Sequence, residues 1–207
     1  MIFAINCEIC RMQKITFSDI ENLLKADRSV RRFDASRHIS LDALERIVGL
    51  TRYCASARNL QPLRYMAISE TEDCDALFPL LSWAGYYEWW PGPDIDQRPT
   101  GYIIQCLDTS LTANPMCDDG LHLQAMTMGA TAWGMGCCII KAFNATKLKE
   151  LFKLPDYIEP RYVLAVGYPA EKTAIVEMGA DGNYKYYRDK DDTQCVPKRS
   201  LEEILLK

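Results

Sequence analysis

Basic side chains gather in a short turn near the start of the chain. Residues 28–33 read Arg-Ser-Val-Arg-Arg-Phe, which brings Arg28, Ser29, Arg31 and Arg32 within five positions. A guanidinium can hold a phosphate through two parallel, charge-assisted hydrogen bonds, and a serine hydroxyl adds a short neutral donor. The turn is therefore a candidate phosphate clamp, although a solvated basic turn would use the same residues.

Two other segments carry polar groups of kinds that bind ligands. Ser56, Asn59 and Gln61 lie in a loop of small and polar residues, and amide side chains offer the donors and acceptors that suit the edge of a heterocycle. Lys198 and Arg199, near the C-terminus, could add a second phosphate contact. The alternatives are a polar loop that enters a strand and a cationic lead-in to the last helix.

Several familiar catalytic motifs are absent from the sequence. It holds no G-x-G-x-x-G, no Walker A loop and no G-x-S-x-G nucleophile elbow. With His38 and His122 as its two histidines, the chain offers little for a Ser-His or Cys-His pair. Cys7 and Cys10 form a C-x-x-C that a thiol-redox or metal site could use, but no second such pair follows. We therefore predict no metal site.

Composition predicts one folded domain. The 207 residues are 48% hydrophobic and 25% charged, which is an ordinary balance for a folded domain. The formal net charge of −4 argues against a nucleic-acid partner, and no apolar run is long enough for a membrane span. The nine cysteines are irregularly spaced and no signal peptide precedes them, so we expect a cytoplasmic protein. We assign residues 1–11 to an N-terminal extension and 12–207 to a single domain.

Hydrophobic periodicity and capping signals predict mixed helices and strands. The first helix is expected near Ser18, where Ser18 and Glu21 could form a capping box, and the second near Ser40. An irregular, aromatic loop is expected at 83–93. Further helices are predicted at 71–81, 117–134 and 144–152 and after Ser200, with strands at 63–69, 102–107, 136–140 and 161–167. This order predicts a sheet covered by helices, of the α/β or α+β class.

Five motifs, taken together, carry a resemblance to a known family. In order they read RSVRRF, SARNLQP, GATAWGMGCCIIKAF, YVLAVGYP and PKRSLEEIL. The set resembles the nitroreductase-like, FMN-dependent flavoproteins, especially their short members, over the chain from about Met12 onward. The resemblance implies an α+β sandwich with a central mixed or antiparallel sheet covered by helices. It also implies an intertwined homodimer that holds FMN at its interface, with the small-residue helix at 117–134 as the candidate dimer core.

The resemblance also implies which residues contact FMN. The basic turn would contact the phosphate and the ribityl chain, and Arg31 would also approach the N1–C2=O side of the flavin. A backbone N–H of Lys141 or Ala142 would bond flavin N5. Trp89 and Trp90 could stack a planar substrate, or the aromatic loop could simply bury apolar area. The implied cofactor set is Arg28, Ser29, Arg31, Ser56, Asn59, Gln61, Ile139, Ile140, Lys141, Ala142, Lys198 and Arg199.

The implied activity is the NAD(P)H-dependent reduction of small planar acceptors, such as nitroaromatics or quinones, by ping-pong hydride transfer through FMN. The sequence departs from many family members at Lys141-Ala142, where an acidic residue and a glycine are common. Lysine there changes the charge where nicotinamide would dock. The alternatives are an FMN-binding storage or sensor protein without turnover, a dehalogenase or flavin-fragmenting relative, and a thiol-redox protein.

Overall fold

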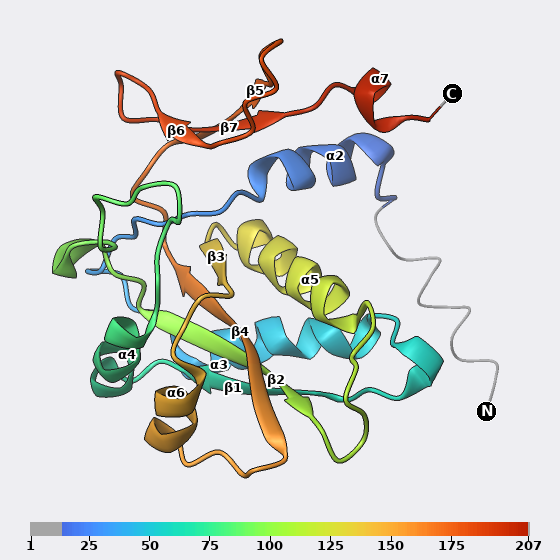
Figure 1. Ribbon diagram of the computed structural model, residues 1–207, viewed down its shortest axis with the longest axis vertical. Helices are drawn as coiled ribbons and strands as arrows, with labels where there is room; N and C mark the ends of the chain where they lie inside the picture. Colours follow the sequence, from blue (N-terminus) through green and yellow to red (C-terminus); the bar gives the residue numbers. More distant parts are fainter. Residues whose placement is uncertain (1–13, 207) are drawn as a thin grey trace.

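Four antiparallel strands form the central sheet of the computed structural model, which describes residues 14–206 (Figure 1). The strand order is β1-β2-β4-β3, so the two middle strands are paired on both sides. All eight residues of β2 are buried, as are the last five of β4, in keeping with this central place. The strands are β1 (Leu63–Ile68), β2 (Gly101–Asp108), β3 (Gly136–Ile140) and β4 (Ile158–Gly167).

Helices cover both faces of this sheet. Successive strand residues point to opposite faces, and the core accordingly divides in two. Ile103 and Leu164 pack in one cluster with Leu44 and Met126, which come from α3 and α5. Ile104 and Val163 belong to the other cluster, with side chains from α4 and α6. The helices are α2 (Phe17–Ala26), α3 (Leu41–Gly49), α4 (Thr71–Leu77), α5 (Asp118–Ala132), α6 (Ala145–Leu151) and α7 (Leu201–Ile204).

Short 3-10 turns join several of these elements. The first two follow α3 and lead toward β1, and the third extends α4 past Pro79. The turns are η1 (Leu50–Tyr53), η2 (Ala57–Asn59), η3 (Phe78–Leu80) and η4 (Ile95–Gln97).

A second, three-stranded sheet is built from the C-terminal part of the chain. Its order is β5-β7-β6, with β5 parallel and β6 antiparallel to the middle strand. In Figure 1 this sheet lies at the top of the molecule, beside α2 and away from the central sheet. Its strands are β5 (Thr173–Glu177), β6 (Tyr187–Arg188) and β7 (Gln194–Lys198).

The fold class predicted from the sequence is confirmed, since helices and an antiparallel sheet form an α+β arrangement. Ser40, Asn144 and Ser200 cap α3, α6 and α7 as expected. The first capping box was wrongly placed. The capping box lies two residues earlier in the chain, at Thr16 and Asp19. The Thr16 N–H donates to the Asp19 carboxylate at 2.8 Å, and the Asp19 N–H donates to the Thr16 hydroxyl at 3.2 Å.

Residues 1–13 lie outside the described range. The C-x-x-C pair of Cys7 and Cys10 and the predicted domain boundary near Met12 fall there, so these predictions stay untested. Within residues 14–206, no helix combines the length and apolar character needed to cross a membrane. In the same range, no group of three or more His, Cys, Asp or Glu side chains has a metal-binding arrangement.

Candidate active site

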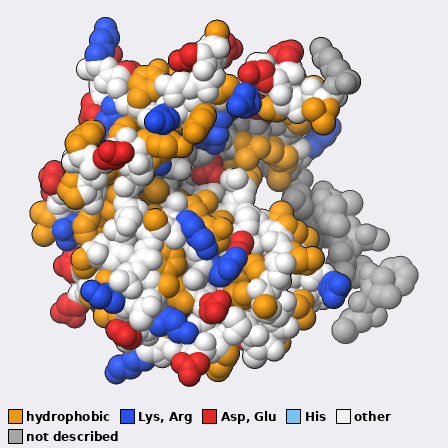
Figure 2. Space-filling model, in the orientation of Figure 1, with side chains coloured by type: hydrophobic (Ala, Val, Ile, Leu, Met, Phe, Trp, Pro, Cys, Tyr) orange, Lys and Arg blue, Asp and Glu red, His pale blue; other side chains and the backbone are white. Residues whose placement is uncertain are grey.

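A small cavity is lined by residues from both the N-terminal and the C-terminal parts of the chain. It has a volume of about 200 Å³, and the basic turn, α5, β3 and β7 form its walls. Figure 2 shows the face on which the C-terminal sheet sits above the rest of the molecule, with a hollow between them and Lys and Arg side chains near its upper edge. The residues that line the cavity are Asp27, Arg28, Ser29, Gln124, Thr127, Cys137, Ile139, Val196 and Lys198.

Backbone pairing fixes the basic turn at this cavity. The turn follows α2 directly and runs beside the edge of β3, where Ser29 and Cys137 form a parallel bridge. Val30 donates its N–H to the Cys137 carbonyl at 2.8 Å, and its side chain is buried. Burial of Val30 on one side of the extended turn leaves its neighbour Ser29 exposed on the other.

Arg28 brings an unused donor into the cavity wall. Its Nη2 donates to the Leu24 carbonyl at 2.9 Å, which holds the guanidinium against the last turn of α2. Its Nε is buried and has no hydrogen-bond partner among the described residues. A buried donor without an acceptor is costly, and a bound anion would remove that cost.

Asp27 is an acidic member of the same cavity that sequence reasoning missed. Its Oδ2 accepts hydrogen bonds of 2.6 Å from both Thr127 Oγ1 and Gln124 Nε2. The carboxylate is thereby fixed to α5 beside Arg28. The cavity holds two cations, Arg28 and Lys198, and this one carboxylate.

Arg31 points to a different environment. It is buried, and its guanidinium stacks on the Tyr186 ring at 4.4 Å from the centroid. Its Nη1 has no hydrogen-bond partner among residues 14–206. Arg31 is therefore close in sequence to the cavity residues but is not among the cavity's lining residues.

The predicted flavin-edge segment crosses from β3 into the following loop. Ile139 is exposed and lines the cavity, whereas Ile140 points into the core. Lys141 donates from Nζ to the Arg161 carbonyl at 2.9 Å and lies over the Tyr162 ring. Partial burial and the nearby Arg161 charge lower the pKa of Lys141. The Ala142 carbonyl accepts the Ser82 N–H at 2.9 Å.

The C-terminal motif splits at the cavity. Lys198 is the last residue of β7 and lines the cavity. It comes from near the C-terminus, whereas Arg28 comes from near the N-terminus. Arg199 lies outside the lining set and pairs with Glu203 at 3.3 Å on the first turn of α7. The structure thus brings together Arg28, Ser29, Ile139 and Lys198 from the predicted cofactor set.

The polar loop at Ser56 lies against the other end of α5. Ser56 Oγ donates to Asp118 at 2.6 Å, and Ala57 N donates to the same carboxylate at 2.9 Å. Asn59 and Gln61 have positive φ angles of 54° and 51°, a region that side-chain-bearing residues seldom adopt. At a rise of about 1.5 Å per residue, Asp118 lies ~14 Å along the helix from Thr127 at the cavity. One chain therefore does not bring this loop to Arg28.

The predicted substrate aromatics flank the C-terminal sheet. Trp90 packs partly against the core, and the Arg32 guanidinium lies 5.9 Å from its ring centroid. Trp89 is 72% exposed. The Tyr87 ring lies near both tryptophans; it is buried, and its hydroxyl donates to Gln194 at 2.9 Å.

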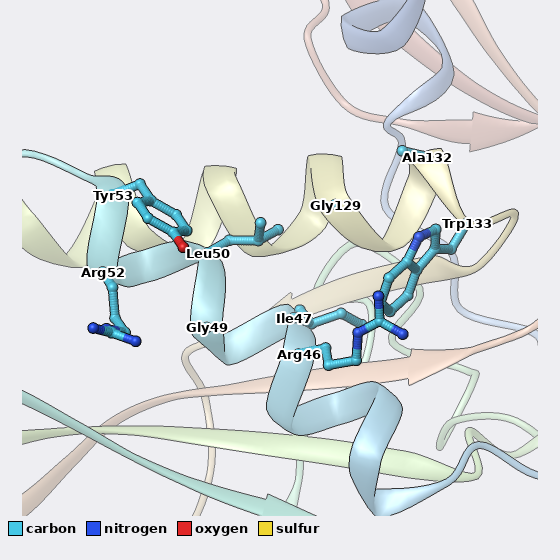
Figure 3. A pocket seen from close by; sticks show the side chains of 9 residues that line it. All are labelled: Arg46, Ile47, Gly49, Leu50, Arg52, Tyr53, Gly129, Ala132 and Trp133. Atoms are coloured by element: carbon cyan, nitrogen blue, oxygen red, sulfur yellow. The ribbon is translucent and has the colours of Figure 1, made fainter. Parts of the chain in front are cut away.

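A larger cavity of about 490 Å³ lies between α3, η1 and α5 (Figure 3). Leu50 and Ile47 line it together with Gly129, and Arg46 stacks on Trp133 at its rim. None of the predicted cofactor or substrate residues lines this cavity. It offers an apolar hollow, whereas the smaller cavity offers charged donors.

Comparison with known proteins agrees with the fold and motifs. The model of the nitroreductase family matches residues 24–94 and 108–168, which include the basic turn, the Ser56 loop and β3. Because the match spans most of the sequence, the chain belongs to the nitroreductase family.

Individual relatives are distant in sequence. One, from Methanothermobacter thermautotrophicus and provisionally named an NADH dehydrogenase/NAD(P)H nitroreductase, is 21% identical over 80% of this chain and 85% of its own. A nitroreductase family protein of Streptococcus pneumoniae has a TM-score of 0.64 at 18% identity, over 91% of this chain and 99% of its own. An FMN-dependent nitroreductase of Clostridium difficile has a TM-score of 0.62 at 16% identity, over 81% and 97% of the chains.

Proposed function

We propose that the protein is an FMN-dependent oxidoreductase that takes electrons from NAD(P)H and passes them to small planar acceptors. The observation that carries the proposal is the cavity at which Arg28, Ser29 and Lys198 meet from opposite ends of the chain. Membership of the nitroreductase family and the FMN-dependent structural relative support the same cofactor.

The cavity residues fit a phosphate. The unpartnered Arg28 Nε needs an acceptor, and the exposed Ser29 hydroxyl and the Lys198 ammonium add two more donors. FMN carries a phosphate charge of roughly −1.5 to −2 at neutral pH. Asp27 opposes that charge, so the pair of cations is needed to make the cavity attractive to an anion.

Residues beyond the phosphate cavity would orient the cofactor. When bound, FMN supplies the hydride-accepting and hydride-donating chemistry. Ile139 offers an exposed apolar surface next to the cavity, and Lys141 and Ala142 follow it in the chain. Lys141 puts a cation two residues after Ile139 in the chain, which would favour an anionic nicotinamide phosphate or acceptor nearby. Arg31 would stabilise negative charge on the reduced ring.

We propose that a second copy of the chain supplies the Ser56 loop. One argument is the distance of ~14 Å along α5 between this loop's anchor and the cavity. The other is a stripe of partly or fully exposed apolar residues at helical spacing on the outer face of α5. These residues are Leu121, Ala125, Met128 and Ala132.

Steady-state NAD(P)H oxidation tests the activity. We expect purified protein saturated with FMN to oxidise NADH or NADPH with a quinone or a nitroaromatic as acceptor. Parallel lines in double-reciprocal plots of the initial rate, taken at several acceptor concentrations, would indicate a ping-pong mechanism. A flavin-storage or sensor protein would bind FMN without turnover. FMN binding with no NAD(P)H oxidation above that of free FMN would therefore contradict the enzyme and favour that second function.

A further inference from the structure

A deeply buried carboxylate, that of Glu171, lies between the basic turn and the C-terminal sheet. Glu171 follows β4 by four residues, and its side chain is 1% exposed. A carboxylate so deeply buried must be satisfied by several donors, because desolvation of an unpaired charge is costly. Its donors come from two segments that are distant in the sequence.

One side of Glu171 holds the backbone of the basic turn. Its Oε1 accepts the N–H groups of Arg31 and Arg32, the second at 3.2 Å. The Ala170 N–H in turn donates to the Arg32 carbonyl at 2.9 Å, so the two segments are held in register. These bonds fix the direction in which the turn leaves Ser29.

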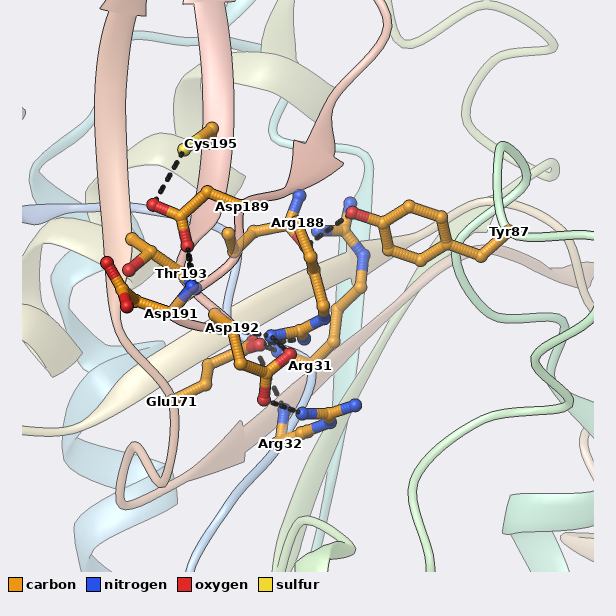
Figure 4. A network of polar contacts seen from close by, with 11 residues as sticks. Arg31, Arg32, Tyr87, Glu171, Arg188, Asp189, Asp191, Asp192, Thr193 and Cys195 are labelled. Atoms are coloured by element: carbon orange, nitrogen blue, oxygen red, sulfur yellow. Dashed lines mark hydrogen bonds and ion pairs between the residues drawn. The ribbon is translucent and has the colours of Figure 1, made fainter.

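The other side of Glu171 holds the C-terminal sheet. Its Oε2 accepts a hydrogen bond from Arg188, the last residue of β6, and the two side chains form an ion pair (Figure 4). The Arg188 side chain is 12% exposed. Lys172, next in the chain, accepts the Gln194 N–H on its carbonyl at 2.8 Å at the start of β7.

An outer arc of charges closes the network. Arg188 Nη1 donates to the Asp192 carbonyl at 2.9 Å, and Asp192 Oδ2 pairs with Arg32 Nη1 at 2.6 Å. Figure 4 shows Glu171, Arg188, Asp192 and Arg32 around one centre. Asp192 is exposed, whereas Glu171 is buried, so the inner carboxylate is the stronger link.

We infer that Glu171 is a positioning residue that couples the two walls of the candidate phosphate cavity. The basic turn carries Arg28 and Ser29 on one wall, and β7 carries Val196 and Lys198 on the other. Glu171 is not among the lining residues of the cavity. It bonds directly to Arg31 and Arg32 of the basic turn, and it reaches β7 through Arg188 of β6, which pairs with Gln194. Its consequence for FMN rests on the proposed function, whereas the coupling itself is a property of the protein without a ligand.

Amide hydrogen exchange of the flavin-free protein tests the coupling. Glu171→Gln keeps the shape of the side chain and one carbonyl acceptor but removes the charge that pairs with Arg188. We expect exchange to accelerate by about tenfold or more at residues 31–32 and also at 194–198, because charge-assisted hydrogen bonds are worth about 1.5–3 kcal/mol. Amides of β2 should keep their protection. Glu150→Gln, an exposed carboxylate on α6, is the matched control and should change neither segment.

Binding then tests the consequence. The same Glu171→Gln protein should bind FMN roughly tenfold more weakly, with riboflavin binding changed by less than about threefold, because only the phosphate needs both walls. Acceleration confined to residues 31–32, or spread equally into β2, would overturn the coupling. Coupled acceleration with unchanged FMN affinity would overturn the positioning role.

Two further measurements test the role of Glu171 when the Glu171→Gln protein fails to fold or when the wild-type protein binds no FMN. If Glu171→Gln does not fold, Asp192→Asn removes the side-chain charge that pairs with Arg32 and Arg188 and leaves the bond from Arg188 to the Asp192 carbonyl in place, so it should give the same exchange pattern with a smaller amplitude. Loss of protection in neither segment would then contradict the coupling. If the wild-type protein binds no FMN, the proposed function fails, and the exchange pattern alone still decides whether Glu171 couples the walls.

Discussion

Asp27 opposes the cations of the cavity to which it belongs. Its carboxylate lies in the same wall as Arg28 and is held by Thr127 and Gln124. Coulomb energies between charges a few ångströms apart near a protein surface amount to a few kcal/mol before solvent screening. The carboxylate should therefore weaken the attraction of the cavity for a phosphate while it holds the end of α2 in place.

Removing this charge without changing the shape isolates the electrostatic effect. We expect Asp27→Asn to tighten FMN binding about three- to tenfold, because the amide oxygen can still accept from Thr127. Fluorescence titration with FMN checks this, and riboflavin is the control that should not change. Weaker FMN binding by Asp27→Asn would show instead that the carboxylate orients Arg28.

The cysteine thiols make a second prediction at this scale. Burial raises the pKa of Cys74 and of Cys106 to about 12, so at pH 8 almost no thiolate is present at either position. Cys117 is exposed at the start of α5. Timed alkylation followed by mass spectrometry should therefore modify Cys117 well before Cys74 and Cys106, which should stay unmodified until the protein unfolds. Early modification of Cys74 would contradict the packing of α4 on the sheet.

Sequence reasoning at this scale was limited by long-range contacts. Residue type and the family resemblance predicted Arg28 and Arg199 as phosphate contacts, with Lys198 as a further one. The cavity brings Arg28 and Lys198 together, whereas Arg199 lies outside its lining. Asp27 and Glu171 were missed, because their roles come from partners about 100 and 140 residues away. A carboxylate beside an arginine in the sequence gives no sign of which donors will surround it.

At the scale of elements, close packing joins the basic turn to the end of β4. A Cβ added to Gly167 would lie 2.6 Å from Phe33 Cδ1, and Phe33 is fully buried. We expect Gly167→Ala to cost about 1–3 kcal/mol through overpacking, which lowers Tm by several degrees for a domain of this size.

The control for that change is a glycine with free space around it. A Cβ on Gly120 of α5 would meet no atom within 4 Å, and alanine in a helix is favoured over glycine by up to about 1 kcal/mol. Thermal unfolding of both variants should show opposite shifts. An unchanged Tm for Gly167→Ala would contradict the seating of Phe33 against β4.

Most elements of the central sheet could be predicted because each carries its own signal. The strand predicted at 136–140 coincides with β3, and Asn144 and Ser200 mark their helices. The C-terminal sheet could not be predicted. Its strands are only two to five residues long, β7 contains Pro197, and the parallel pairing of β5 with β7 depends on a link through Lys172 and Gln194.

At the scale of the whole molecule, the predicted cofactor residues divide into two groups along α5. The Ser56 loop bonds to Asp118 at one end, and the cavity lies near Thr127 toward the other. If a second copy completes the site, light scattering at micromolar concentration should give twice the chain mass of 23.6 kDa. A monomer that still binds FMN tightly would contradict the shared site.

The two cations of the cavity should make the protein bind FMN more tightly than riboflavin. Riboflavin has the same ring system but lacks the phosphate, so it reports on folding and ring binding without the two cations. Arg199 pairs with Glu203 outside the cavity, and Arg199→Ala should weaken FMN binding by less than about threefold. An effect as large as that of Lys198→Ala would show that the C-terminal motif rearranges when FMN binds.

The affinities of Arg28→Ala and Lys198→Ala for FMN and for riboflavin test the phosphate site most directly. Each charge-assisted hydrogen bond contributes about 1.5–3 kcal/mol, so each variant should bind FMN roughly ten- to a hundredfold more weakly and riboflavin almost unchanged. The double variant should lose less than the sum, because both cations serve one phosphate. Unchanged FMN affinity in both variants, or equal weakening of FMN and riboflavin, would contradict a phosphate site at this cavity.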